Sequence, residues 1–390
     1  MINVAIIGTG NISTQHIQGF LEFPDRCRIV RITDIIAGKA EKKARDFKLD
    51  AAASISFEDA LHDPEVDLVS ICTPPFEHAR LAIAALNAGK HVIVEKPMAA
   101  SLEECDGIIA AAQKSGRIFS PVAQNRFRDP IANLKKLLDS GKAGRVVHAQ
   151  IDSHWWRGHA YYDLWWRGTW QKEGGGCTLN HAVHQIDMLG WMLGLPQKIT
   201  AVLSNVSHDN AEVEDISIAI LQYGASELCA KGALAQITSS VVHHGDEQQV
   251  IFQCEKARLS APWKVVASTA QPNGFPLKNE ALENELTADY QALPSLKHTA
   301  HAGQIENVLD AIEGKGALLI QGVDGRKTIE LITAIYKAGA EQRPVELPIV
   351  SGDPFYTVEG IMRLVPHFYE KKNSVENQEG NITVGSTYQK

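Results

Sequence analysis

The 390-residue sequence has no apolar run that approaches the ~18 residues of a membrane-spanning helix. Strand-like apolar residues begin at Asn3, which leaves no room for the regions of a signal peptide. The net charge is −8 and no basic patch stands out. We therefore expect a cytoplasmic protein with neither a nucleic acid nor a membrane as its partner.

Cysteine is scarce and scattered, without a Cys-x-x-Cys pair or the clustering of a disulfide framework. Reduced, mostly buried thiols are therefore expected. The sequence also lacks internal repeats and low-complexity segments, and its 44% hydrophobic and 22% charged residues are typical of a globular protein. At a prior of about 150 residues per domain, the length predicts two domains.

The N-terminal stretch NVAIIGTGNISTQH has the order strand, glycine-rich turn, helix. Gly8, Gly10 and Ser13 occupy the GxGxxG/A frame of a dinucleotide-binding turn, with Ser13 as a small departure that should still pack. Gly8 permits the tight turn, and Gly10 lets the backbone approach a pyrophosphate at the helix N-terminus. A second strand ends at Asp34, about the spacing expected for an acid that binds the adenosine ribose.

Asp34 favours NAD, because a carboxylate at this place would repel a 2′-phosphate. The two isoleucines that follow supply no positive charge to offset that repulsion. The lysines of AGKAEKKARDF lie one or two helical turns further on and could still tolerate NADP, so NADP is not excluded. Asp34 could also cap the helix predicted over Gly38–Phe47.

Strands and helices alternate through the first third of the chain, which predicts a doubly wound parallel sheet. Ligands of such sheets bind beyond the carboxyl ends of the strands. The buried strand VDLVSICTP delivers Thr73, Pro74 and His78 to that edge, and the strand HVIVE delivers Glu95 and Lys96. The sheet thus presents a lysine at the expected cofactor crevice.

Lys96 has two interpretations. A lysine at a strand end is most often a solvated surface group, but Pro97 fixes the backbone directly after it. A lysine held there can hydrogen-bond a substrate hydroxyl and favour an alkoxide-like transition state. The polar cluster Gln124–Asn125–Arg126 follows the next strand and is the expected exit from the first domain.

The stretch Gly174–Asp187, GGGCTLNHAVHQID, joins three glycines to a predicted helix. Asn180, His184 and Asp187 lie at spacings of four and three, so they would share one helix face. Glycines give close backbone access to a ligand, and histidine can exchange a proton near neutral pH without a large pKa shift. A merely solvated helix face is the alternative, but it explains neither the glycines nor the aromatic segment before them.

That segment, HWWRGHAYYDLWWRGTWQKE, is far richer in aromatics than the 7% of the whole chain. Aromatic rings stack on the C–H faces of sugars, so a carbohydrate or cyclitol is expected, although about half of these rings should serve packing. The candidate substrate-binding residues are Arg126, Trp155, Tyr161, Tyr162, Trp166, Arg167, Asn180 and His184. A zinc site from His181, His184 and His154 or His159 lacks carboxylate or cysteine partners, so no metal is expected.

The remainder of the chain from Val146 onward has short alternating strands broken by polar turns, which indicate an antiparallel sheet. Helices are predicted over Ala302–Glu313 and Arg326–Ala340. The tail Ser351–Lys390 has an ordered-looking piece, DPFYTVEGIMRLVPHFY, and then a polar stretch from Glu370 that is expected to be disordered.

The sequence resembles the glucose–fructose oxidoreductase, inositol dehydrogenase and MocA-like (Gfo/Idh/MocA) oxidoreductases. The matching pieces include AIIGTGNIS, ICTPPFEHA, AGKHVIVEKPMA, LDSGKAGRVV, WWRGTW and GGGCTLNHAVHQID, in the family's order over most of residues 1–348. The resemblance implies an α/β fold with a Rossmann domain over 1–123 and a second domain with a large, mostly antiparallel sheet over 124–348. It leaves 349–390 as a C-terminal extension, and it implies a homo-oligomer, dimer or tetramer, formed through that sheet.

The resemblance also implies residue roles. Lys96 of EKP would be a catalytic or substrate-orienting lysine, often followed by a cis-proline, and His184 would transfer the proton. Members usually carry an aspartate four residues before that histidine, where this sequence has Asn180, which cannot act as a base. Proton transfer therefore falls to His184, with Lys96 in support and Asn180 as an orienting group. The expected cofactor-binding residues are Gly8, Gly10, Asn11, Ile12, Asp34, Thr73, Pro74, His78, Glu95, Lys96 and Gln124.

The expected function is hydride transfer between NAD and a secondary alcohol or ketone of a sugar, glycoside or cyclitol. One alternative is a glycoside-cleaving enzyme that keeps its NAD and uses transient oxidation to enable elimination. The other alternative is a non-catalytic regulator that senses the dinucleotide. Retention of both Lys96 and His184 argues against the regulator.

Overall fold

The computed structural model describes residues 1–376, which form two compact units. The first unit comprises Met1–Phe127 and Leu296–Ile329, and the second comprises Arg128–Ser295 and the chain from Glu330 onward. The first unit thus includes a segment from late in the sequence, so the domain boundary expected after residue 123 is not a single cut. Each unit is described by itself.

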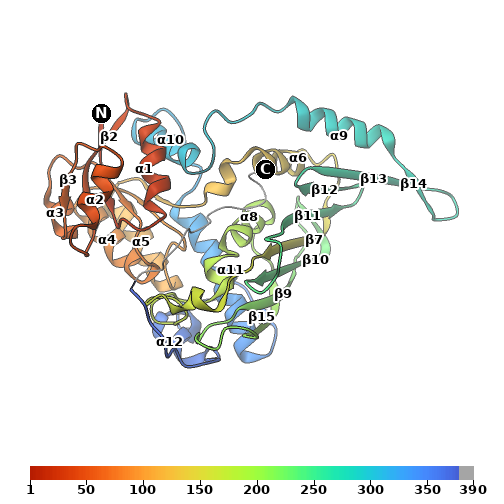
Figure 1. Cartoon of the computed structure of the whole chain (residues 1–390). Coiled ribbons are helices and arrows are strands. Elements are labelled where there is room, and N and C mark those ends of the chain that lie inside the picture. The colour runs from red at the N-terminus through yellow and green to blue at the C-terminus, as the bar shows by residue number, and fades with distance from the viewer. Residues whose placement is uncertain (377–390) are drawn as a thin grey trace. The chain divides into compact units, whose positions relative to one another are not determined.

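The first unit is built on a six-stranded parallel sheet with strand order β3-β2-β1-β4-β5-β6 (Figure 1). Its strands are β1 (Ile2–Ile7), β2 (Cys27–Thr33), β3 (Ala52–Ser54), β4 (Leu68–Ile71), β5 (His91–Val94) and β6 (Phe119–Pro121). Its helices are α1 (Ser13–Leu21), α2 (Lys39–Asp46), α3 (Phe57–His62), α4 (His78–Asn87), α5 (Leu102–Ser115) and α10 (Ala300–Ile312). This confirms the doubly wound sheet, whose strand order reverses between β1 and β4 and so opens a ligand crevice there.

Helix α10 belongs to the first unit because its apolar face packs against α1. A Cβ atom at Gly19 would lie 2.7 Å from Cδ1 of Ile305, so the glycine is what lets the two helices approach. Ile305 and Val308 are fully buried in the same core as Val4 and Ile17. The helix predicted over 302–313 is therefore present, and it completes one layer of the Rossmann unit.

The second unit is built on a nine-stranded sheet with strand order β14-β13-β12-β11-β7-β10-β9-β8-β15 (Figure 1). Its strands are β7 (Val146–His154), β8 (Lys198–Ser204), β9 (Ile216–Gln222), β10 (Cys229–Ser240), β11 (Gln248–Cys254), β12 (Ala257–Ala261), β13 (Lys264–Ala270), β14 (Pro276–Lys278) and β15 (Val345–Glu346). Only β7 and β10 pair in parallel, so the expected mostly antiparallel sheet is confirmed. The stretch QQVIFQCEKARLSA turns back on itself and forms both β11 and β12.

The helices of the second unit are α6 (Asp129–Asp139), α7 (Cys177–Asn180), α8 (Val183–Leu193), α9 (Glu280–Ala292) and α12 (Val358–Leu364). Helix α11 (Gly322–Glu341) begins in the first unit and ends in the second. Helix α9 runs beside β13, where the carboxylate of Glu283 accepts a hydrogen bond of 2.9 Å from the backbone N–H of Ala267 (Figure 1). No helix described in residues 1–376 combines the length and apolar character needed to cross a membrane.

The C-terminal extension packs on the second unit through residue 376. Phe355 is buried, and Lys337 of α11 forms an ion pair with Asp353. The backbone N–H groups of Lys372 and Asn373 donate to Oδ1 of Asn210, so the disorder expected from Glu370 onward is wrong for residues 370–376. The rest of that predicted stretch, 377–390, lies outside the described residues. The six cysteines are free thiols and all are buried, as expected.

Candidate active site

The glycine-rich turn between β1 and α1 uses its two glycines differently. Gly8 has φ +89°, and a Cβ atom there would lie 2.7 Å from the carbonyl oxygen of Cys72. A Cβ atom at Gly10 would have no neighbour within 4 Å, so this position leaves open space beside the start of α1. Ser13 is buried and its Oγ donates to the carbonyl of Gly10 over 2.7 Å, which keeps the turn closed despite the unusual third position. Asn11 and Ile12 follow Gly10 and precede the helix.

Asp34 ties this turn to the end of β2. Its Oδ2 accepts hydrogen bonds from the backbone N–H of Thr9 at 2.9 Å and from Thr9 Oγ1 at 2.6 Å. Its Oδ1 accepts from the N–H of Ile36. Helix α2 starts later, with Gly38 as its N-cap, so Asp34 does not cap that helix. The carboxylate instead places a negative charge beside the glycine-rich turn.

The carboxyl ends of β4 and β5 are joined by His78. Its Nδ1 lies 2.7 Å from the carbonyl oxygen of Pro97, and its Nε2 lies 2.9 Å from that of Thr73. The ring is fully buried, and burial lowers the pKa of His78. Pro74 begins a 3₁₀ turn here, and the Lys96–Pro97 bond is cis. His78 therefore holds in place the backbone on both sides of the crevice.

Glu95 lies in a buried ion pair directly before Lys96. Its Oε1 is 2.8 Å from Nε2 of His16 and 3.3 Å from Nε2 of His301, while its Oε2 accepts from the backbone N–H of Lys96 at 3.1 Å. Although burial opposes it, contacts with Cys72 and Glu95 raise the pKa of His16 to about 10. Sequence analysis missed both histidines, because α1 and α10 reach Glu95 only in the folded sheet.

The same three side chains could be taken for a metal site. Within residues 1–376, one group of side chains has potential metal-binding atoms within 4.8 Å of one another: His16, Glu95 and His301. Both ring nitrogens of His16 are already hydrogen-bonded, to Ser70 and Glu95, and its raised pKa keeps the ring protonated. A metal ligand needs a free nitrogen lone pair, so the group is better described as an ion pair that supports Lys96.

The crevice side of the first unit fits a dinucleotide. Gly10 leaves room for a pyrophosphate at the N-terminus of the nine-residue helix α1. Within residues 1–376, the buried Oγ1 of Thr73 and Oε1 of Gln124 have no hydrogen-bond partner, as expected of groups that bind a ligand. Arg126, expected near the substrate, is buried and lies 3.5 Å from Asp324.

In the second unit the predicted proton-transfer helix is broken in two. Asn180 is the last residue of α7 and His184 is the second residue of α8. The break arises because the N–H of Ala182 bonds to the carbonyl of Cys177, five residues back, which widens the turn. Asn180 lies on α7 whereas His184 and Asp187 lie on α8, so the expectation that all three share one face of a single helix is wrong.

The glycines before α7 allow close packing against other segments of the same chain. A Cβ atom at Gly176 would lie 1.9 Å from the carbonyl oxygen of Glu214, and one at Gly175 would lie 2.1 Å from Oη of Tyr336. These glycines therefore let the backbone approach Glu214, just before β9, and Tyr336 of α11, and their substitution would displace α7.

Glu214 is a buried acid behind the glycine run that sequence analysis missed. It accepts hydrogen bonds from the N–H groups of Gly176 at 3.1 Å and Thr178 at 3.0 Å, and from Oη of Tyr336 at 3.1 Å. Burial outweighs these donors and raises the pKa of Glu214 to about 7. The carboxyl thus changes charge close to neutral pH at the base of α7.

This shifted pKa predicts a pH-dependent stability. In the unfolded chain Glu214 ionises near its usual pKa of 4.5, so between about pH 4.5 and 7 only the folded state keeps the proton. Folding is therefore disfavoured as the pH rises through this window, by on the order of 3 kcal/mol in total. As the pH rises from 5 to 7.5, the wild-type protein should lose about 2–3 kcal/mol of stability relative to the Glu214→Gln protein, as measured by urea unfolding. Parallel curves would contradict the assignment.

The aromatic segment forms a cluster with two arginines. The guanidinium of Arg167 lies 4.2 Å from the ring centroid of Tyr161 and 4.3 Å from that of Trp166. Arg157 lies 5.1 Å from the ring of Trp155 and 5.6 Å from that of Tyr161. Contacts at these distances are favourable cation–π interactions. We call Trp155, Arg157, Tyr161, Trp166 and Arg167 the aromatic–arginine cluster.

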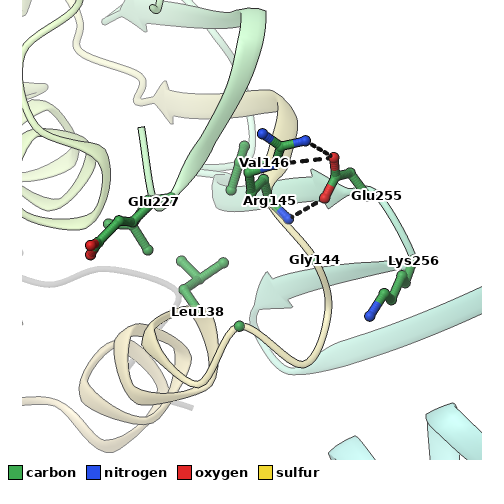
Figure 2. A pocket seen from close by; sticks show the side chains of 9 residues that line it. Leu138, Gly144, Arg145, Val146, Glu227, Glu255 and Lys256 are labelled. Carbon is green, nitrogen blue, oxygen red and sulfur yellow. Dashed lines mark hydrogen bonds and ion pairs between the residues drawn. The ribbon is translucent and has the colours of Figure 1, made fainter. Parts of the chain in front are cut away.

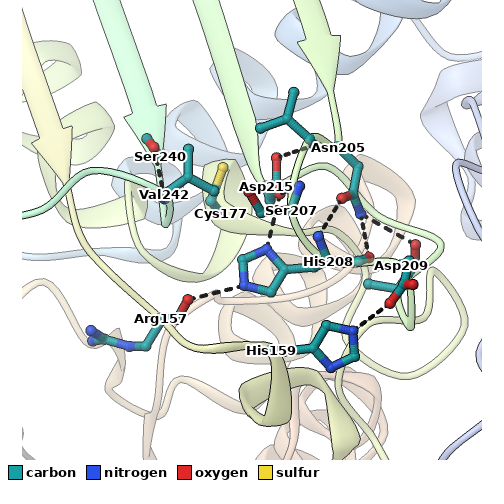
Figure 3. Close-up of polar contacts among 12 residues, drawn as sticks. Arg157, His159, Cys177, Asn205, Ser207, His208, Asp209, Asp215, Ser240 and Val242 are labelled. Atoms are coloured by element: carbon teal, nitrogen blue, oxygen red, sulfur yellow. Dashed lines mark hydrogen bonds and ion pairs between the residues drawn. The ribbon is translucent and has the colours of Figure 1, made fainter.

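Tyr162, also expected near the substrate, is instead in the core. It is 1% exposed and packs edge-on against Tyr161 and His208. Figure 3 shows how His208 holds the segment, with Nδ1 2.9 Å from Asp215 and Nε2 3.1 Å from the carbonyl of Arg157. His159 in turn contacts Asp209. The loop before β9 thus holds the aromatic segment in place through His208 and Asp209.

Glu173, directly before the glycine run, joins the cluster to the helix break. It is 1% exposed and accepts hydrogen bonds from Nη1 of Arg167 at 3.0 Å, from the N–H of Gly168 at 2.6 Å, and from Nδ2 of Asn180. Sequence analysis missed it, although a lone acid next to the glycines and the unusual Asn180 was a usable signal.

A separate pocket of about 230 Å³ lies between the end of α6 and strands β7 and β11 (Figure 2). Its charged wall is the ion pair of Arg145 and Glu255 at 2.7 Å, with both side chains well exposed. None of the expected site residues lines it. The pocket is therefore distinct from the candidate site.

Comparison with known proteins identifies the family. Residues 2–122 match the NAD-binding Rossmann fold of an oxidoreductase family, and residues 131–260 match the GFO/IDH/MocA C-terminal domain. The chain belongs to the GFO/IDH/MocA family. It is therefore an oxidoreductase, and its first unit is an NAD-binding domain.

Similar proteins span nearly the whole chain. An uncharacterized oxidoreductase, YrbE of Bacillus subtilis (strain 168), is 27% identical over 77% of this chain and 89% of its own length. The scyllo-inositol 2-dehydrogenase (NADP(+)) IolW of the same organism is 25% identical over 89% and 96%. Among solved structures, the WlbA dehydrogenase from Bordetella pertussis in complex with NADH and UDP-GlcNAcA has a TM-score of 0.75 at 25% identity, covering 90% of this chain and 98% of that one.

Proposed function

We propose that the protein oxidises a secondary alcohol, or reduces the corresponding ketone, of a sugar, glycoside or cyclitol with NAD. The observation that carries the proposal is the pair of hydrogen bonds by which Glu173 links Asn180, four residues before His184, to Arg167 of the aromatic–arginine cluster. It places a polar group from the same segment as the candidate proton-transfer residue beside rings suited to a sugar face. Relatives named for scyllo-inositol, or solved with UDP-GlcNAcA, support the same substrate class.

In the proposed mechanism His184 accepts the hydroxyl proton as the C–H bond gives up its hydrogen with both electrons. When bound, NAD accepts that hydride, or returns it in the reverse direction. The Lys96 ammonium hydrogen-bonds the oxygen on which negative charge develops, and the ion pair at Glu95 holds the lysine's backbone. Asn180 orients the substrate or the histidine by hydrogen bonding.

We propose NAD as the cofactor because the carboxylate of Asp34 lies beside the glycine-rich turn that follows β1. A 2′-phosphate brought to that carboxylate would be repelled.

The test is a screen of NAD and NADP reduction, and of the reverse reaction, against sugars, cyclitols and glycosides. Turnover with NAD on at least one polyol supports the proposal. Release of free sugar without net NADH would instead indicate the NAD-retaining glycoside-cleaving alternative. Tight NADH binding without turnover in either direction would indicate a dinucleotide-sensing regulator.

We also propose that the protein is a homo-oligomer joined through the open face of the nine-stranded sheet. Outward-facing positions of β8 and β9 alternate with buried ones, yet they carry Val202, Ile218 and Ile220, which are 60%, 50% and 49% exposed. Val202 and Ile218 lie directly opposite one another across the two strands. A contiguous apolar face of this kind is typical of a subunit interface.

The interface predicts a change in mass on substitution. The double variant Ile218→Lys/Ile220→Lys would bury two unpaired charges at the interface, so we expect dissociation to monomers at micromolar concentration. Light scattering after size exclusion measures the mass. Val350→Lys, at an apolar residue that is 62% exposed outside the sheet, is the control and should leave the mass unchanged. A wild-type monomer would contradict the proposal.

A further inference from the structure

A buried carboxylate, that of Glu173, stands directly beside Asn180 at the end of α7. Nδ2 of Asn180 donates a hydrogen bond to Oε1 of Glu173. A carboxylate can only accept, so the amide nitrogen must face Glu173 and the amide oxygen must face the other way. The orientation of Asn180 is therefore set by its neighbour.

Glu173 is surrounded by donors. Besides Asn180, Nη1 of Arg167 lies 3.0 Å from Oε1, and the N–H of Gly168 lies 2.6 Å from Oε2. Burial raises the pKa of Glu173, but Arg167 and the other donors oppose this and match the ionised form. The three donors, one of which is the guanidinium of Arg167, stabilise the ionised form of this buried carboxyl group.

We propose that Glu173 is a positioning residue that fixes the amide of Asn180 and supplies the buried negative charge at the end of α7. The inference rests on the proposed function and deepens it. The charge is shared with Arg167, which lies over the rings of Tyr161 and Trp166. Glu173 thus joins Asn180 to the aromatic–arginine cluster.

Glu173 and Asn180 form a matched pair, because each excludes the alternative residue at the other position. An aspartate at 180 would bring a second carboxylate into contact with the buried carboxylate of Glu173, which favours uptake of a proton by one of them. A glutamine at 173 with Asn180 retained would leave Arg167 without its buried counter-charge. In the double variant Glu173→Gln/Asn180→Asp, the amide at 173 donates to the carboxylate at 180. The pair therefore keeps one negative charge.

The test compares Glu173→Gln, Asn180→Asp and the double variant with the wild-type protein, on a substrate found by the screen. We expect each single variant to lose about tenfold or more in kcat/KM, as removal of one partner of a buried charged pair does. Asn180→Asp should also shift the acidic limb of the pH profile upward, since the shared proton must leave. The double variant should recover to within about fivefold of wild type.

Two further measurements separate positioning from folding. Affinity for NADH should be unchanged in all variants, because both substituted residues lie in the second unit. Glu330→Gln, at another buried glutamate of that unit that accepts a backbone N–H, is the matched control and should lower the melting temperature without moving the pH profile.

The outcomes are distinguishable. If wild type turns over substrate while Glu173→Gln keeps its rate and pH profile, or if the double variant is no better than the singles, the inference fails alone. If the wild-type protein turns over no substrate, the proposed function fails. If the changes in melting temperature of the two single variants sum to that of the double variant, Glu173 and Asn180 are not coupled, and the pairing fails as well.

Discussion

Replacement of His184 by alanine should lower kcat by about 10²- to 10⁴-fold, the usual contribution of a positioned acid or base. The side chain lies at the start of α8, partly exposed and four residues after Asn180. Alanine at this position keeps helical geometry, so the loss should fall on the chemical step. Steady-state kinetics with NAD on a substrate from the screen measures it, and fluorescence titration should give an unchanged NADH affinity.

The control for this variant is His367→Ala, at a half-exposed histidine of the second unit whose Nε2 lies 2.9 Å from the carbonyl of Met362. It should retain wild-type kcat. Near-full turnover by His184→Ala with intact NADH binding would remove His184 from the mechanism. Loss of NADH binding would point to a folding defect, which circular dichroism detects.

Replacement of Gly8 by alanine should cost several kcal/mol of stability and abolish NADH binding. The position has φ +89°, which costs about 1–3 kcal/mol for a residue with a side chain. The added Cβ would also lie 2.7 Å from the backbone oxygen of Cys72, which belongs to the end of β4 and cannot move alone. Urea unfolding and an NADH titration measure the two effects.

Gly10→Ala is the matched control in the same turn. Its Cβ would meet nothing within 4 Å, so stability should stay within about 1 kcal/mol of wild type or rise. NADH affinity should still fall about tenfold or more, because the methyl group occupies the space through which the backbone approaches the pyrophosphate. Equal stability losses at both glycines, or unchanged NADH affinity in Gly10→Ala, would contradict this division of roles.

Local patterns were enough to predict the first unit. The buried strand run through Ile6, the glycine frame and the helix after it are contiguous in sequence, and their order dictates a parallel sheet. In the second unit, alternation indicated an antiparallel sheet but did not give each of its strands. The fold class could therefore be predicted because each element carries its own periodicity.

The surroundings of the site could not be predicted in this way. His301 reaches Glu95 across about 200 positions of sequence, and Tyr336 reaches Glu214 across more than 120, so no local spacing announces either contact. The break after Asn180 depends on a backbone hydrogen bond of Ala182 that composition does not encode. Local patterns singled out candidate reactive side chains but not the buried acids Glu173 and Glu214.

The central claim is hydride transfer between a substrate carbon and the nicotinamide. The most direct measurement follows deuterium placed on the oxidised carbon of a substrate from the screen. We expect mass spectrometry to find one deuterium at C4 of the nicotinamide for each ketone formed by the wild-type protein. Unlabelled NADH, or deuterium released into water, would contradict the proposed function.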